Sequence, residues 1–452
     1  MDHASSILQG SKAFEVNNRL VLAIAVPMTL AYITTPLLGL VDTAVVGQFG
    51  NAALLGGLAA GAIIFDVVFS SFNFLRSGTT GLVAQAFGRG DALEERAVFL
   101  RACAIALGCG LGVVLCMPLI AAFGEWFMGA APDVSAAMDT YIRIRLLSSP
   151  AALLNYAILG YFLGRGEANL GLLLQLVLNG INIVLSIWFG LHLGWGVAGV
   201  AWGTLCGEAI TALLGLSIIL RRFSVMPKVE WGQIFAPAAM RRLLALNGDI
   251  MIRSFVLMGA FTLLTRQGAQ LGTLTLAANA VLMHFFMVSS YFLDGFATAA
   301  EQLAGRAVGA RYQPAFSKAI RLTSLWGFGM AGVASIVVLL FGDQLVAIIT
   351  TSEEVRAEAA YYLPWAAFTA LSGVMAFQMD GVFIGATWSR DMRNMMLLSL
   401  LAFVTMLLLV APIFGNSGLW AALHVFLLVR GISLFAIMRR REREAFRLDK
   451  AT

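Results

Sequence analysis

The sequence predicts an all-α integral membrane protein with twelve transmembrane helices arranged in two six-helix bundles. Three observations lead to this prediction: a very apolar composition, twelve apolar segments of membrane-spanning length, and a weak repeat between the two halves. Of the 452 residues, 60% are hydrophobic and only 12% are charged, whereas a soluble domain carries about 25% charged residues. The positions of the charges, which total +5, indicate membrane topology, and no nucleic-acid partner is expected.

The apolar segments fall into two groups of six on either side of a polar break. A helix needs about 20 apolar residues to cross the hydrocarbon core of a bilayer. The first six segments are roughly 20–46, 53–75, 97–122, 138–163, 169–190 and 195–220. The last six are roughly 242–265, 272–297, 319–341, 358–386, 394–413 and 417–438.

The lysines and arginines support this count, because the cytoplasmic loops of membrane proteins are enriched in both. With a cytoplasmic N-terminus, the cytoplasmic loops and tail hold most of them, and the opposite loops hold only Arg266 and Arg356. Arg143 and Arg145 fit less well, since they lie toward the outer end of the fourth segment. We therefore expect both termini to be cytoplasmic.

The polar break divides the chain into two predicted lobes, residues 1–220 and 242–438, joined by a linker at 221–241 and followed by a basic tail at 439–452. Two short motifs recur between the lobes. QAFGR at 85–89 returns as QLAGR at 302–306, and GYFLG at 160–164 returns as GVFIG at 381–385. We expect both matches to fall at equivalent helix ends. Because each lobe has an even number of helices, we expect a parallel repeat about an axis along the membrane normal, as in some transporters.

Asp42 is the only charge in the apolar stretch that begins at Leu20. A carboxylate at bilayer depth costs roughly 2.5–3.5 kcal/mol, so such residues are rare and usually functional. Pro27 and Pro36 precede Asp42, and each removes a backbone donor and can kink a helix. The pattern favours an acid that couples protons to helix bending. The alternative is a position at the outer interface, because a straight helix rises about 33 Å from Leu20 to Asp42.

The fifth predicted helix carries a row of polar side chains within an apolar segment. Asn179, Asn182 and Ser186 are spaced three and four residues apart, which places them on one helix face. Such a face is expected to point inward, where its amides and hydroxyl can bond to neighbouring helices. A purely structural role for this row is the alternative.

The second half carries its own set of charges at or within predicted helices. These are Asp249, Arg253, Asp294 and Asp380. Asp249 and Arg253 lie four residues apart and can pair on one helix face. In the first half, Asp66 and Glu208 also lie in predicted helices, where cavity lining and helix packing explain them equally well.

Six stretches of the chain resemble the multidrug and toxic compound extrusion (MATE) family, and within it the DNA-damage-inducible protein F branch. They are PLLGLVDTAVVG (36–47), TTGLVAQAFG (79–88), ALNGDIMIRS (245–254), ANAVLM (278–283), LDGFA (293–297) and DGVFIGAT (380–387). The resemblance implies two six-helix lobes in a V shape, and export of small, cationic or amphipathic organic compounds by proton or sodium antiport. We expect a monomer surrounded by lipid in a bacterial inner membrane.

The resemblance also implies where the coupling site lies. It puts the coupling acid on the first helix, which is Asp42 here, and polar residues of helices four to six around it. The matching positions are Asn155, Asn182 and Thr204, with Asn179 one turn before Asn182. We expect these four residues and Ser186 to line the substrate cavity. Many relatives carry a second aspartate where this chain has Ser186. Because Na⁺ favours several hard oxygen ligands and a single buried acid can take up a proton, we expect H⁺ coupling, with Na⁺ as the alternative and no cofactor or metal ion.

In the second lobe, this chain departs from some relatives at Arg253. Those relatives place a glutamate near this position, where it helps bind sodium opposite an aspartate that matches Asp380. An arginine would repel Na⁺ and could pair with Asp380 or Asp294 instead. We therefore predict a fixed ion network in this lobe, and a network without a transport role is the alternative.

Other functions find little support in the sequence. An intramembrane enzyme would need a reactive cluster such as HExxH or GxSxG, and an ATP-driven pump would need GxxxxGK[ST]. The sequence contains none of these motifs, so no enzymatic activity is expected. A lipid-linked precursor flippase is the remaining alternative, although it would normally add helices or a strongly cationic cavity.

Overall fold

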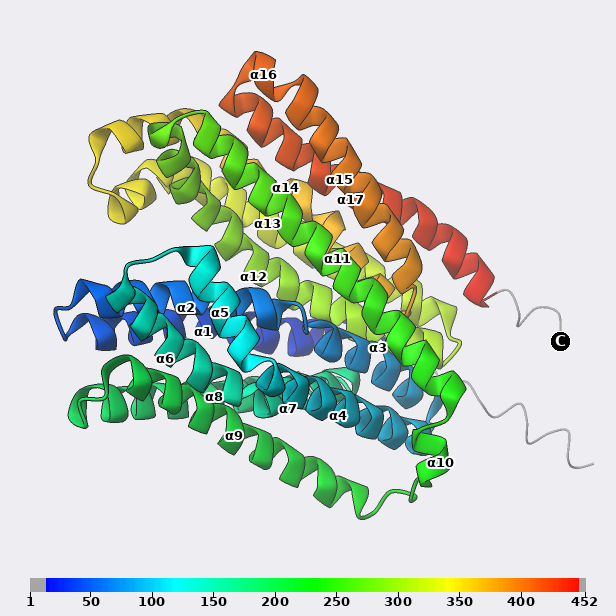
Figure 1. Ribbon diagram of the computed structural model, residues 1–452. Coiled ribbons are helices and arrows are strands. Elements are labelled where there is room, and N and C mark those ends of the chain that lie inside the picture. The colour runs from blue at the N-terminus through cyan, green and yellow to red at the C-terminus, as the bar shows by residue number, and fades with distance from the viewer. Residues whose placement is uncertain (1–13, 447–452) are drawn as a thin grey trace, which may run out of the picture. The chain divides into compact units, whose positions relative to one another are not determined.

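The computed structural model describes residues 14–446, and helices make up most of this part of the chain (Figure 1). Apolar segments become long helices because a helix bonds its own backbone groups, which lipid cannot do. Eleven described helices are long and apolar enough to cross a membrane, and a bent pair raises the number to twelve if it forms one span. The prediction of an all-α fold with twelve spans is confirmed. Arg447 and Lys450 of the predicted basic tail lie outside the described residues.

The chain forms two compact units, which are described separately below. Of the described residues, unit 1 contains 14–29, Phe87–Gly90 and 248–446, while unit 2 contains Leu30–Ala86 and Asp91–Asn247. The predicted lobe boundaries at 220 and 242 concern the order of the membrane helices and stay a prediction. Three helices run through a unit boundary: α1(Asn18–Gly47), α3(Phe74–Arg89) and α11(Pro237–Gln270).

Unit 2 is built around packed helix pairs. α8 lies along α9, α2 along α6 and α4 along α7, and Figure 1 shows α8 and α9 side by side. The angle between α6 and α7 is 51°, so the fourth predicted segment is bent. The helices that lie wholly within unit 2 are α2(Ala52–Ser70), α4(Ala92–Leu115), α5(Met117–Met128), α6(Pro132–Leu147), α7(Ser149–Gly164), α8(Ala168–Ile187), the π-helix η1(Trp188–His192), α9(Gly196–Phe223) and α10(Trp231–Ile234).

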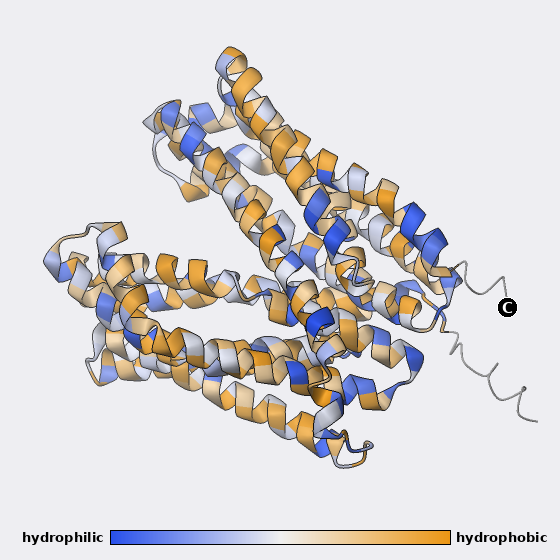
Figure 2. Cartoon of the chain, turned by 45° about the vertical axis from the view of Figure 1, so that its right-hand side comes forward, coloured by the Kyte–Doolittle hydropathy of each residue, from blue (hydrophilic) through white to orange (hydrophobic). Residues whose placement is uncertain are grey.

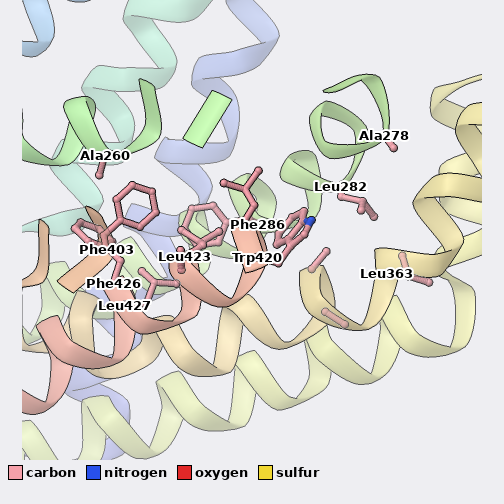
Figure 3. Close-up of a cluster of buried hydrophobic side chains, with 14 of the residues drawn as sticks. Ala260, Ala278, Leu282, Phe286, Leu363, Phe403, Trp420, Leu423, Phe426 and Leu427 are labelled. Atoms are coloured by element: carbon pink, nitrogen blue, oxygen red, sulfur yellow. The ribbon is translucent and has the colours of Figure 1, made fainter. Parts of the chain in front are cut away.

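Unit 1 is organised around α14, which packs against α12, α13 and α17. Figure 3 shows part of its apolar core, where Phe286, Phe403, Trp420 and Phe426 gather from α12, α15 and α17. Such close packing of large side chains fixes the rotation of each helix about its axis. The helices are α12(Thr273–Gly309), α13(Gln313–Ile349), α14(Glu353–Gly385), α15(Ser389–Leu409), α16(Ala411–Phe414) and α17(Asn416–Phe446).

Hydrophobic residues predominate along the helices of both units (Figure 2). Large apolar side chains such as Leu115, Ile348 and Leu408 are exposed. A soluble monomer rarely exposes a contiguous apolar surface of this extent. Lipid tails are the surroundings that such a surface requires.

The two halves of the chain repeat the same pattern of helices at a spacing of 221 residues. Four pairs of helices begin at residues that are this far apart, since 273 − 52, 313 − 92, 353 − 132 and 389 − 168 each give 221. The pairs of first residues are Ala52 and Thr273, Ala92 and Gln313, Pro132 and Glu353, and Ala168 and Ser389. Two turns with a positive φ repeat in the same way, at Gly90 and Arg311 and at Gly166 and Thr387. The predicted internal repeat is therefore confirmed.

Glycine contacts repeat at the same spacing. A Cβ on Gly160 or Gly164 would overlap the Arg76 or Thr80 carbonyl of α3, and a Cβ on Gly381 or Gly385 would overlap the Ala297 or Glu301 carbonyl of α12. Each residue of the second set follows its counterpart by 221 positions. The 160–164 and 381–385 motifs are thus equivalent helix contacts, where small residues let two helices approach closely.

The other recurring motif is not equivalent in the structure. The segments 85–89 and 302–306 are 217 residues apart, which is four fewer than the structural spacing. The first ends at the last residue of α3, whereas the second lies about one turn before the end of α12. The expectation that both lie at equivalent helix ends was therefore wrong. A shift of four residues keeps side chains on nearly the same helix face, so sequence similarity alone does not detect it.

The Gly381 contact leads to a stability prediction. Gly381→Ala is expected to lower the free energy of unfolding by about 1–3 kcal/mol, because a methyl group would push α14 away from the Ala297 carbonyl. Gly329→Ala in α13 is the control, since a Cβ there meets nothing within 4 Å. Thermal unfolding of the detergent-purified variants measures the difference. Equal midpoint temperatures for the two variants would contradict the packing argument.

Candidate functional site

Asp42 lies near the C-terminal end of α1, inside unit 2. Its exposed fraction is 8%, so the side chain is enclosed by protein. The Ser186 hydroxyl of α8 lies against its carboxyl group. The other carboxyl oxygen, Oδ1, is buried and has no hydrogen-bond partner among the described residues. An acid with an open acceptor position is chemically able to receive a proton or a ligand.

The two prolines of α1 do not interrupt it in this structure. The helix is continuous from Asn18 to Gly47, through Pro27 and Pro36. Pro27 belongs to unit 1, whereas Pro36 and Asp42 belong to unit 2. Each proline still lacks the backbone donor of an ordinary residue, so helix bending at these positions stays a prediction.

The predicted row of polar side chains on α8 makes hydrogen bonds to two neighbouring helices. Asn182 Nδ2 donates to Thr204 Oγ1 of α9 over 2.7 Å, and Ser186 Oγ donates to Asn182 Oδ1 over 3.2 Å. One turn earlier, Asn179 Nδ2 donates to Thr34 Oγ1 of α1 over 2.9 Å. All four predicted residues of this group are buried. The row on α8 is therefore bonded to α9 through Asn182 and to α1, the helix that carries Asp42, through Asn179.

Two glycines explain how α9 comes this close to the polar face of α8. A Cβ on Gly203 would overlap the Ser186 backbone nitrogen, and a Cβ on Gly207 would press on Leu178 and Asn182. Small residues at such contacts let polar side chains bond across two membrane helices. The spacing of the polar residues places them on one face of α8, and the glycines of α9 let that helix approach this face.

A second polar centre in unit 2 surrounds Arg145 of α6, whose exposed fraction is 5%. Its Nη1 donates to Glu208 Oε1 of α9 and to Ser148 Oγ, each over 3.1 Å. The guanidinium carbon lies 3.8 Å from the ring centroid of Phe65, a cation–π contact. Arg145 thus departs from the enrichment of lysine and arginine in cytoplasmic loops because it is buried in the protein. Arg143, in contrast, is exposed and pairs with Asp139 over 2.7 Å.

Asn155 belongs to this second centre by its hydrogen bond. Its Nδ2 donates to the backbone carbonyl of Glu208 over 2.9 Å. The remaining predicted residues belong instead to the polar groups near Asp42; they are Asn179, Asn182, Ser186 and Thr204. Sequence reasoning noted Glu208 and Arg145 separately and missed that they pair. The signal for Arg145 was its conflict with the charge rule, but nothing in the sequence identified its partner.

In unit 1, Asp380 of α14 lies between two arginines. Arg253 of α11 and Arg430 of α17 both donate to its Oδ2, and Arg430 Nε also donates to Oδ1 over 3.2 Å. The Arg430 side chain is 2% exposed. Pairing of Arg253 with Asp380 was one of the arrangements that the sequence suggested, whereas Arg430 was missed. The signal for Arg430 was the one that identified Asp42, a single charge inside an apolar segment.

Asp249 pairs with a different helix from the one expected. Arg393 Nη1 donates to its Oδ1 over 2.6 Å, and Ser389 Oγ donates to its Oδ2 over 2.8 Å, both from the start of α15. The Arg253 side chain on its own helix instead bonds Asp380. Asp294 lies within electrostatic range of Arg430. Within residues 14–446, no group of three or more His, Cys, Asp or Glu residues could hold a metal ion.

Comparison with known proteins places this geometry in a protein family. The MatE family model matches the chain twice, over residues 27–188 and 250–411, in agreement with the structural repeat. DNA damage-inducible protein F of Escherichia coli strain K12 is 38% identical over 423 residues, which cover 92% of this chain and 91% of that protein. The probable multidrug resistance protein NorM of Chromobacterium violaceum is 25% identical, and the match covers 96% of each chain.

Solved structures show the same fold. The crystal structure of MATE in the bent conformation superimposes with a TM-score of 0.86 at 19% identity, and the match covers 96% of this chain and 97% of that one. A MOP superfamily transporter from Pyrococcus furiosus gives a TM-score of 0.85 at 18% identity, over 95% of this chain and 96% of that one.

Proposed function

The chain belongs to the multidrug and toxic compound extrusion (MATE) family of membrane transporters, and from this premise we propose that it is a proton-coupled antiporter of small organic compounds. Membership makes it an integral membrane protein of a multidrug efflux family. The coupling ion, the substrate class and the transport cycle are our proposal. It includes export of cationic or amphipathic compounds from a monomer in a bacterial inner membrane, with both termini in the cytoplasm.

The observation that carries the proposal is the environment of Asp42. The carboxyl group is buried, faces one hydroxyl and keeps one oxygen without a partner. A buried ionised carboxylate is unfavourable unless it is paired, so it favours a cationic substrate or a proton. Either ligand can satisfy the acid, and competition between the two ligands is the basis of antiport.

The ligands around Asp42 favour the proton over sodium. Ser186 stands where many relatives have a second aspartate, and the α8 row contributes neutral amides and hydroxyls that are bonded to one another. A bound Na⁺ must recover the energy of its lost hydration from several oxygen ligands, usually including charge. A proton needs only the one carboxylate oxygen.

We propose an alternating-access cycle built on this acid. In the outward-facing state, ionised Asp42 holds the cationic substrate. A proton from outside neutralises Asp42, α1 bends near Pro27 or Pro36, the cavity in unit 2 contracts and the substrate leaves. Return to the inward-facing state releases the proton to the cytoplasm. The substrate and the proton thus use the same carboxylate at different times.

An ion-gradient experiment tests the proposal directly. Purified protein in proteoliposomes is expected to move ethidium, an aromatic monocation, when a pH gradient is imposed in the absence of Na⁺. A Na⁺ gradient at equal pH on both sides is expected to give the rate of protein-free liposomes. Transport that follows the Na⁺ gradient and ignores the pH gradient would overturn proton coupling.

A further inference from the structure

Arg145 is a buried cation beside the proposed coupling acid. We propose that Arg145 makes the Asp42 site selective for protons, because it engages the Glu208 carboxylate that a sodium ion would need as a second charged ligand. This inference rests on the proposed proton coupling and names the residue that enforces it. Its basis is the way in which Arg145 is held, the acids around it and the different ligands that the two ions require.

Arg145 is held in place by contacts from three helices. Glu208 of α9 and Ser148 at the end of α6 accept hydrogen bonds from Nη1, and Phe65 of α2 lies against the guanidinium plane. The Tyr141 hydroxyl of α6 also bonds to it. A guanidinium keeps its charge at any physiological pH. The positive charge in this interior is therefore fixed in position and always present.

Three acids surround this single cation. Besides Glu208, the carboxylates of Asp42 in α1 and Asp66 in α2 lie within electrostatic range of Arg145. The other titratable groups nearby are Tyr141, Tyr156 and Arg76. Glu208 Oε2 and Asp42 Oδ1 are both buried without hydrogen-bond partners among the described residues. The centre therefore contains more carboxyl groups than Arg145 can pair with.

The selectivity arises from the ligands and not from charge alone. A proton and a sodium ion each add one positive charge, so the charge of Arg145 opposes both to a similar degree. Sodium, however, must be surrounded by several oxygen ligands, and affinity rises with the number of charged ones. Arg145 offers only N–H donors and occupies one oxygen of Glu208. With Arg145 in place, Asp42 can still be protonated, whereas the Glu208 carboxylate is held by the guanidinium and is less available to sodium.

Removal of Arg145 is therefore expected to create a response to sodium. R145Q leaves three neighbouring acids without the charge of Arg145, so two double variants with equal charge accompany it. R145Q/D66N keeps both Asp42 and Glu208, whereas R145Q/E208Q keeps Asp42 and Asp66 but lacks the carboxylate that Arg145 engages. The control for loss of an arginine is R143Q on the same helix, at the exposed pair with Asp139.

The measurements are ethidium transport driven by a Na⁺ gradient and the rise in unfolding temperature when NaCl replaces choline chloride. R145Q and R145Q/D66N are expected to show transport on the order of tenfold above the wild-type rate under the Na⁺ gradient, together with stabilisation by Na⁺. Wild type, R143Q and R145Q/E208Q are expected to show neither. A purely structural role for Arg145 would not produce a gain that depends on Glu208.

The outcomes separate this inference from the proposed function. If R145Q does not fold, the two double variants decide, because they change the total charge equally. A Na⁺ response in neither double variant, or an equal response in both, overturns the role of Arg145 while proton-driven wild-type transport stands. Wild-type transport driven by Na⁺ overturns the proposed proton coupling itself.

Discussion

Asp42→Asn is expected to reduce efflux under a pH gradient to the rate of protein-free liposomes, while the protein stays folded. Asparagine has nearly the shape of aspartate and can bond to the Ser186 hydroxyl, so the packing of α1 against α8 should be kept. It cannot gain or lose a proton in the physiological range. The variant therefore removes the proposed coupling step and little else.

Two further measurements make this result specific. Asp139→Asn is the matched control, because this carboxylate is partly exposed and pairs with the exposed Arg143; it should transport ethidium at the wild-type rate. Binding of ethidium to each purified variant, followed by fluorescence anisotropy, separates loss of coupling from loss of substrate binding. Wild-type efflux by Asp42→Asn with an unchanged dependence on the pH gradient would refute the proposed role.

The sequence could indicate Asp42 and the α8 row as polar groups inside the protein for a simple physical reason. An isolated charge in an apolar segment is visible because lipid makes it costly. Residues spaced three and four apart share a helix face whatever the rest of the fold does. Both signals are local, so they need no knowledge of which helices are neighbours. The structure then added two contacts that join the row to α1, one between Asn179 and Thr34 and one between Ser186 and Asp42.

Contacts between distant segments could not be predicted in the same way. Arg145 and Glu208 are 63 residues apart, and Asp380 and Arg430 are 50 apart. Their pairing depends on the rotation of each helix about its own axis, which the packing of many side chains decides. Local spacing even suggested the wrong partner for Asp249, since a possible pair with Arg253 gave way to Arg393 and Ser389 of α15. The repeat showed the same limit, because one of two matching motifs is displaced by a helical turn.

Asp380→Asn is expected to have the largest effect on stability among the charge substitutions considered. Without this carboxylate, Arg253 and Arg430 would face each other in the interior of unit 1, and Arg430 is almost completely buried. Breaking a buried ion pair by removing one partner costs about 3–5 kcal/mol. For a protein of marginal stability, this loss should appear as a low yield of monodisperse protein and a strongly lowered unfolding temperature.

The arginine variants show whether Asp380 acts through both partners. Arg253→Met leaves the Asp380–Arg430 pair intact and should destabilise the protein less than Arg430→Met, since Arg430 is more buried and donates to both carboxylate oxygens. Arg440→Met serves as the surface control, because its pair with Glu444 is exposed and such pairs contribute at most about 1 kcal/mol. The expected order of destabilisation is Asp380→Asn, Arg430→Met, Arg253→Met and then Arg440→Met. If Asp380→Asn unfolded at the temperature of the surface control, the pair would contribute nothing to the fold. Normal proton-driven efflux by a folded Arg253→Met variant would indicate that the Asp380 network contributes only to stability. Proton coupling would then depend on unit 2.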